Sequence, residues 1–227
     1  MRTSGIASTF AIAAALLLWA PGGLPGLDRP RVHAQSSEAE LDARVRAFLE
    51  SRRGTWRDMN VPVVDGQTLH DLIVKHKYTR ALEIGTSTGH SAIWIAWALS
   101  KTGGRLITLE IDERRHRQAL ENFRAAGVDR FIDARLGDAH EIVPALEGPF
   151  DFVFSDADKN GYKNYLTALL PKLVPGGCYV THNVSPRGGG ITPDDYLPFV
   201  MNHPELETTV DTRGAGMSIS FKKAGNR

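Results

Sequence analysis

Residues 81–91, Ala-Leu-Glu-Ile-Gly-Thr-Ser-Thr-Gly-His-Ser, constrain the fold of this chain more than any other stretch. The apolar run before Gly85 predicts a strand, and the apolar residues at helical spacing after Ser91 predict a helix. Two glycines between them allow a tight turn that brings the backbone close to a ligand, with free helix N–H groups facing the same space. The stretch therefore predicts a strand, a turn and a helix start beside a small bound molecule.

From residue 80 onward, short apolar runs alternate with amphipathic segments. We expect strands at residues 80–84, 105–110, 131–136, 150–155 and 177–182, and helices at residues 90–100, 113–126, 139–146 and 161–173. This alternation is typical of an α/β fold with a doubly wound, mostly parallel sheet covered on both faces. A helix at 191–202 and strands at 205–212 and 217–222 complete a seven-stranded sheet that ends in an antiparallel hairpin.

Length and charge limit the class of protein. A chain of 227 residues fits one α/β domain with a buried core. Its 27 basic and 26 acidic residues give a net charge of +1, which offers no electrostatic case for binding nucleic acid. The single cysteine, Cys178, excludes an internal disulfide and a cysteine-based zinc site.

The amino-terminal segment differs from the rest of the chain. Arg2 precedes an apolar run at 6–20, and a small-x-small pattern precedes Gln35. This pattern predicts a signal peptide or signal anchor at 1–34, followed by an N-terminal helix and connection at 35–57 and the main domain at 58–227. The run is shorter than the ~20 residues of a membrane-spanning helix, which favours cleavage.

We accordingly expect an exported protein, periplasmic or secreted, or one anchored to the membrane through this leader. A cytoplasmic protein with a buried N-terminal helix is the alternative. Further helices are expected at 37–51 and 66–76.

The glycine spacing and Glu83 identify the kind of ligand. A pyrophosphate-binding turn needs G-x-G-x-x-G, whereas this turn has G-x-x-x-G. Glu83, at the strand end, would repel a phosphate but accept hydrogen bonds from an ammonium group. A ligand with a cationic amino-acid end and a nucleoside fits better, and S-adenosylmethionine is such a ligand.

Polar residues gather at the carboxyl ends of the other predicted strands, where ligands bind in open α/β sheets. Glu110 is placed to take both hydroxyls of a ribose. Asp138 has two interpretations, an acceptor for an adenine amino group or a cap of the next helix. Asp156 and Lys159 follow the fourth strand, and His182 ends the fifth.

These residues resemble those of the class I S-adenosylmethionine-dependent O-methyltransferases, specifically the catechol and caffeoyl-CoA O-methyltransferase group. The resemblance covers residues 58–222. The matching segments are 59–61 with 65–67, the Leu82 to Ser91 loop, Glu110, the Gly137-Asp138-Ala139 turn, Asp156-Ala157-Asp158-Lys159-Asn160-x-Tyr162, and the His182-Asn183 pair.

The resemblance implies a role for each matching position. The residues implied to bind the cofactor are Val61, Glu83, Gly85, Ser91, Glu110, Asp138, Ala139 and Asp156. Among them, Glu83 and Ser91 would hold the methionine end of S-adenosylmethionine. The residues implied to be catalytic are Lys159, as the base, with Asp156 and His182. Asp156, His182 and Asn183 stand at positions that in this group bind a divalent cation, Mg²⁺ or Mn²⁺.

One position departs from the family pattern, because His182 stands where the family has an aspartate. Imidazole suits Mn²⁺, Fe²⁺ or Zn²⁺ better than Mg²⁺. His182 is therefore a ligand in an altered metal site, a general base paired with Asp156 in a site without metal, or a structural residue at a strand end.

The chemistry accounts for these residue types. A phenol, with a pKa near ~10, must lose its proton to attack a methyl group, and a cation or a lysine can assist. We expect an O-methyltransferase that acts on a small phenolic, catechol-like acceptor with the help of a divalent metal. The alternatives are a metal-independent enzyme that uses His182, a non-catalytic S-adenosylmethionine-binding module, and a nicotinamide-dependent oxidoreductase. A homodimer is left open.

Overall fold

The computed structural model describes residues 29–56, 58–188 and 190–225, with side chains described from Ser37. The leader predicted at 1–34 thus lies almost wholly outside the described residues. None of the described helices is both long and apolar enough to cross a membrane.

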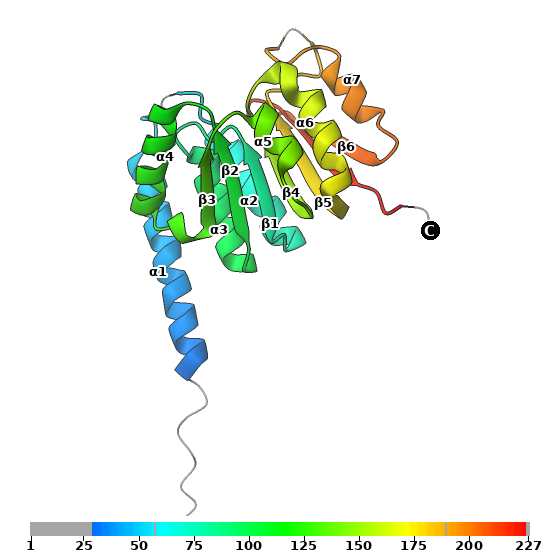
Figure 1. Ribbon diagram of the computed structural model, residues 1–227. Coiled ribbons are helices and arrows are strands. Elements are labelled where there is room, and N and C mark those ends of the chain that lie inside the picture. The colour runs from blue at the N-terminus through cyan, green and yellow to red at the C-terminus, as the bar shows by residue number, and fades with distance from the viewer. Residues whose placement is uncertain (1–28, 57, 189, 226–227) are drawn as a thin grey trace, which may run out of the picture.

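Seven strands form one sheet in the order β3-β2-β1-β4-β5-β7-β6 (Figure 1). The strands are β1 (Arg80–Ile84), β2 (Arg105–Glu110), β3 (Ile132–Leu136), β4 (Phe150–Ser155), β5 (Leu173–His182), β6 (Leu206–Asp211) and β7 (Met217–Lys222). The first five are parallel, while β7 pairs antiparallel with both β5 and β6. The carboxyl ends of five strands therefore meet at one edge, as the α/β prediction requires.

Helices cover both faces of the sheet (Figure 1). One face packs against α1 (Arg29–Ser51), α2 (Val63–His76), α3 (His90–Thr102) and α4 (Glu113–Ala126). The other face packs against α5 (Ala139–Ala145), α6 (Tyr162–Leu169) and α7 (Tyr196–Met201). Helix α3 lies between the sheet, α1 and α2, which explains why it is apolar all round rather than amphipathic.

Most predicted elements are confirmed, and β1, β2, β4, β7 and α4 have the predicted bounds. Helix α1 begins at Arg29 instead of residue 37, and α2 begins at Val63 because Pro62 takes the cap position, where its missing N–H costs nothing. Strand β5 begins at Leu173, since a bulge around its glycines resets the pairing with β4. The helix expected at 161–173 ends as a 3₁₀ turn at 170–172. The helix expected at 191–202 is only Tyr196–Met201, beginning after Asp195.

Candidate functional site

A cavity of about 780 Å³ opens at the carboxyl edge of the sheet. It is lined by loops that follow β1 to β5, by Met59, Asn60 and Pro62 before α2, and by Ala215 in the β6–β7 turn. Eight of the residues singled out from the sequence line it: Gly85, Glu110, Asp138, Ala139, Asp156, Lys159, His182 and Asn183. Three others, Val61, Glu83 and Ser91, are buried and do not line it.

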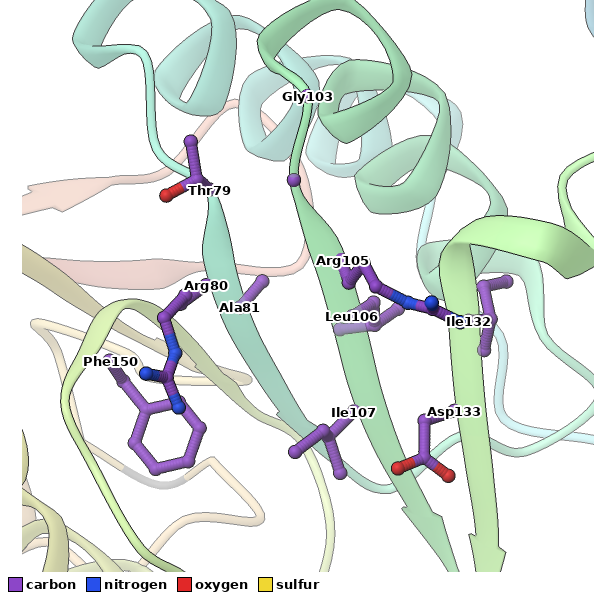
Figure 2. Close-up of a pocket in the computed structure, with 11 residues that line it drawn as sticks. Thr79, Arg80, Ala81, Gly103, Arg105, Leu106, Ile107, Ile132, Asp133 and Phe150 are labelled. Carbon is purple, nitrogen blue, oxygen red and sulfur yellow. The ribbon is translucent and has the colours of Figure 1, made fainter.

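A second hollow, of about 620 Å³, lies at the opposite edge, where β1 to β4 begin (Figure 2). Its charged residues Arg80, Arg105 and Asp133 are exposed to solvent. Figure 2 shows Arg80 beside the ring of Phe150, with Arg105 extending from β2 toward β3. Because ligands bind at carboxyl strand ends in this fold class, the first cavity is the candidate site.

Glu83 is fully buried at the end of β1. Its Oε2 accepts a hydrogen bond from the Thr108 hydroxyl at 2.5 Å, while Oε1 has no hydrogen-bond partner among the described residues. Burial raises the pKa of Glu83 to about 8, although the hydroxyls of Ser91 and Thr108 act in the opposite direction. A buried carboxyl oxygen without a hydrogen-bond partner can accept a hydrogen bond from a bound ligand.

Gly85 turns the chain just after Glu83, with φ +97. A side chain there would put its Cβ 2.6 Å from the carbonyl oxygen of Asp156, so the close approach of the β1 and β4 loops needs glycine. The turn thus brings the predicted cofactor loop against the loop that carries Asp156.

Glu110 is held by three backbone N–H groups. Its Oε2 accepts from Ser87 at 2.6 Å, and its Oε1 accepts from Ile111 at 3.1 Å and Asp112 at 3.0 Å. A carboxylate has about four acceptor positions, so capacity for a ligand hydroxyl remains. Asp138 caps α5 by accepting from the backbone N–H of His140 at 2.8 Å. One of its two interpretations is therefore confirmed, and the adenine contact stays a prediction.

A chain of charged groups that are buried or partly buried reaches the cavity through Asp156, Lys159 and His182. The Nδ1 of His182 lies 3.0 Å from Asp156 Oδ2, and its Nε2 lies 2.9 Å from Asp65 Oδ2. Asp156 Oδ1 accepts from Lys159 Nζ at 2.5 Å. We call these four residues the carboxylate–imidazole chain.

The protonation of His182 follows from its neighbours. Burial alone would lower the pKa of His182, but hydrogen bonds and charges from Asp156 and Asp65 raise it to about 9. At neutral pH both ring nitrogens therefore carry protons, and each donates to a carboxylate.

Asp65 reaches this chain from the first turn of α2 and is 1% exposed. Its Oδ2 also accepts from the backbone N–H of Ala215 at 2.9 Å. A Cβ on Gly214 would lie 1.8 Å from Asp65 Oδ1, so the β6–β7 turn closes tightly over the carboxylate. Asp65 is therefore fixed in position by two elements distant in sequence.

Comparison with known proteins identifies the family of this chain. The family model for O-methyltransferase matches residues 33–213. The chain belongs to this family. As a class I, S-adenosylmethionine-dependent member, it is an enzyme with the Rossmann-like methyltransferase fold, which disfavours the non-catalytic and oxidoreductase alternatives.

Individual relatives of this methyltransferase agree. A catechol O-methyltransferase of Niastella koreensis is 44% identical over 107 residues, 45% of this chain and 48% of that protein. Caffeoyl-CoA O-methyltransferase 2 of Zea mays is 34% identical over 146 residues, 62% of this chain and 55% of that protein. The matches thus span about half the length of these relatives. The O-methyltransferase from Bacillus cereus, solved in complex with SAH, superposes with a TM-score of 0.67 at 27% identity, covering 80% of this chain and 91% of that one.

The residues of this methyltransferase fit S-adenosylmethionine. The unpartnered Glu83 Oε1 is complementary to the ammonium group of its methionine end, and Glu110 retains room for the ribose. Ser91 acts on Glu83 from the first turn of α3. Val61 contributes its carbonyl, which lies 2.8 Å from Nδ1 of His90 and fixes the segment before α2.

The residues of the predicted divalent-cation site fit a metal less well than the cofactor residues fit S-adenosylmethionine. Both ring nitrogens of His182 are engaged with carboxylates, so His182 has no free position for a metal. Asp156 already binds Lys159 and His182, one through each oxygen, which leaves Asp156 with part of its acceptor capacity and the side chain of Asn183 as the other predicted donor. Among the residues that the structure describes, no group of three or more His, Cys, Asp or Glu is arranged to hold a metal.

The sequence interpretation assigned no role to Asp65, although it included residues 65–67 in the resemblance. A lone aspartate in the first turn of a helix usually signals only a favourable helix start. Its partner His182 lies 117 positions away, so no local pattern could pair them.

Proposed function

We propose that this enzyme transfers a methyl group from S-adenosylmethionine to a hydroxyl of a small phenolic acceptor, with Lys159 as the base. The observation that carries the proposal is that Glu110 and the Asp156–Lys159 pair line one cavity, while Glu83, whose Oε1 has no hydrogen-bond partner among the described residues, is buried two positions before the cavity-lining Gly85. One end of the cavity suits the cofactor, and the other holds a group able to move a proton.

S-adenosylmethionine supplies a methyl group bonded to a cationic sulfur, so that transfer forms an O–CH₃ bond and leaves a neutral thioether. Glu83 binds the ammonium group and Glu110 binds the ribose hydroxyls. Holding both ends fixes where the methyl group lies relative to the acceptor, which is the main source of rate in an in-line transfer.

The acceptor is inferred from the mouth of the cavity. Met59 and Ile191 line it and are 72% and 70% exposed. Exposed apolar side chains at a cavity rim favour a flat, partly apolar ligand. The names of the relatives from Niastella koreensis and Zea mays, which refer to catechol and caffeoyl-CoA, agree with a phenolic acceptor.

Lys159 receives the phenolic proton in this proposal. A phenol and a lysine amine have similar reference pKa values, about 10 and 10.4, so proton transfer between them is nearly balanced. The neutral amine of Lys159 takes the proton and becomes an ammonium group, which Asp156 then holds 2.5 Å away. The ring of Tyr162, whose centroid lies 5.2 Å from Nζ, supports the same cation.

The leader remains part of the proposal. We propose that residues 1–34 export or anchor the enzyme. Cleavage before Gln35 would shorten α1 but keep Leu41 and Val45, which are buried against the domain.

The function is tested by replacing the base. We expect Lys159→Met to lower kcat by roughly 10²–10⁴-fold with catechol as acceptor, the range for a lost general base, while the Kd for S-adenosylhomocysteine stays unchanged. Lys163→Met is the matched control, because Lys163 is half exposed, pairs with Asp195 and does not line the cavity. Absence of S-adenosylhomocysteine binding to the folded protein, or full activity of Lys159→Met, would refute the proposal.

A further inference from the structure

The predicted metal donors already satisfy one another. His182 lies between two carboxylates, with 3.0 Å from Nδ1 to Asp156 and 2.9 Å from Nε2 to Asp65. An ionised carboxylate can only accept hydrogen bonds, so each ring nitrogen must donate to the carboxylate it faces, and neither keeps a lone pair for a metal. His182 is 3% exposed and cannot turn toward solvent without breaking both bonds.

Asp65 makes this arrangement rigid. It is bound to the backbone N–H of Ala215, and Gly214 leaves no space beside its carboxylate. Its side chain therefore has one position, and in that position it points at His182 Nε2. Neither the sequence pattern nor the comparisons assign a role to this residue.

We propose that methyl transfer by this enzyme requires no divalent cation, because the carboxylate–imidazole chain occupies the place of the metal site and Asp65 is the positioning residue that holds His182 in it. This inference rests on the proposed function for its reaction and modifies how that reaction is assisted. The phenolic proton still passes to Lys159, and the methyl group still moves from sulfur to oxygen.

The acceptor requirement changes as a consequence. A metal site selects acceptors with two adjacent hydroxyls, because both bind the cation. Without the cation, one hydroxyl next to Lys159 is sufficient. We expect phenol to be methylated as well as catechol.

The first test measures metal directly on the wild-type protein. Mn²⁺ is titrated into the protein and free Mn²⁺ is followed by electron paramagnetic resonance. We expect no loss of the free signal, and we expect EDTA or added Mg²⁺ to leave kcat unchanged. Stoichiometric Mn²⁺ binding, or activity that EDTA abolishes and Mg²⁺ restores, would overturn the inference.

The second test addresses Asp65. We expect Asp65→Asn to lower kcat by up to about 100-fold, as for a misplaced catalytic group, with the Kd for S-adenosylhomocysteine unchanged. Wild-type ¹⁵N–¹H spectra at neutral pH should show two protected ring N–H groups on His182, and the variant should shift the Nε2–H signal.

Asp71→Asn is the matched control for this variant, because Asp71 lies on the same helix with an exposed side chain outside the cavity. It should change neither the rate nor the His182 signals. A wild-type His182 with only one protonated ring nitrogen would contradict the inference even if Asp65→Asn does not fold.

The two proposals fail in different ways. If no phenolic acceptor is methylated with or without metal, the proposed function is wrong, while the Mn²⁺ titration and the His182 spectra still decide the inference. If methylation occurs only with Mg²⁺, the function holds and the inference is wrong.

Discussion

Cofactor binding should release a proton from Glu83, and the structure gives the size of the effect. Burial raises the pKa of this carboxyl from its ordinary value of 4.5 to about 8. At pH 7 the neutral form therefore exceeds the ionised form by about 10 to 1, which corresponds to about 1.4 kcal/mol. Only the ionised form pairs with an ammonium group, so binding must remove the proton.

The expected magnitudes follow by linkage. About 0.9 proton should be released per ligand at pH 7, and the Kd for S-adenosylhomocysteine should fall about 10-fold between pH 6 and pH 7. The ligand's own ammonium group belongs to a free amino acid, whose adjacent carboxylate keeps its pKa above that of a peptide terminus, so it stays charged in this window. His182, with a pKa of about 9, and His90, with a pKa lowered by burial to about 4, do not titrate there either.

Isothermal titration calorimetry at pH 7, in two buffers of different ionisation enthalpy, measures the released proton directly. Glu83→Gln keeps the size of the side chain and should abolish both the release and the pH slope. Adenosine, which lacks the ammonium group, should release no proton from the wild-type enzyme. A wild-type Kd that is constant from pH 6 to pH 7, or a Glu83→Gln variant with the wild-type slope, would refute the reasoning.

Two further predictions concern the whole chain. The free energy of unfolding of the cofactor-free enzyme should fall as pH rises from 6.5 to 9, as measured by urea denaturation. Glu83 and His182 have raised folded-state pKa values, so their contribution is full at low pH and is lost through about 8 and 9, at up to about 1.4 kcal/mol per pH unit for each group. Amino-terminal sequencing of the enzyme from fractionated cells should find Gln35 as the first residue, and recovery of an intact chain in the cytosol would contradict the leader proposal.

The sequence predicted correctly those strands and turns that a short run of neighbouring residues determines. Strand β1 and the turn at Gly85 have the predicted positions, because an apolar run followed by a glycine turn determines both. The helix expected at 191–202 was too long, since the residues before Asp195 form loop structure that apolar spacing alone does not reveal.

The residues of the candidate site that end strands were predictable from the sequence, whereas one of their contacts was not. Glu110, Asp156 and His182 end their strands, and parallel topology brings strand ends together. The partner of His182 was not predictable, because it depends on how α2 docks against the β6–β7 turn. The substitution of histidine for a family aspartate raised the question of the metal, and only the position of Asp65 supplies a structural answer.

Glu83 and His182 are both buried at the carboxyl edge of the sheet, and their different neighbours give them opposite charge states. Glu83 is buried with hydroxyl partners only, so it stays neutral until a cation arrives from the ligand. His182 is equally hidden from water but lies between two carboxylates, so it stays charged. Glu83 therefore has no cationic partner until the methionine end of the cofactor supplies one. The two carboxylates beside His182 already have a cationic partner in its ring. A site with this distribution of charge binds one cationic ligand and has no electrostatic demand for a second.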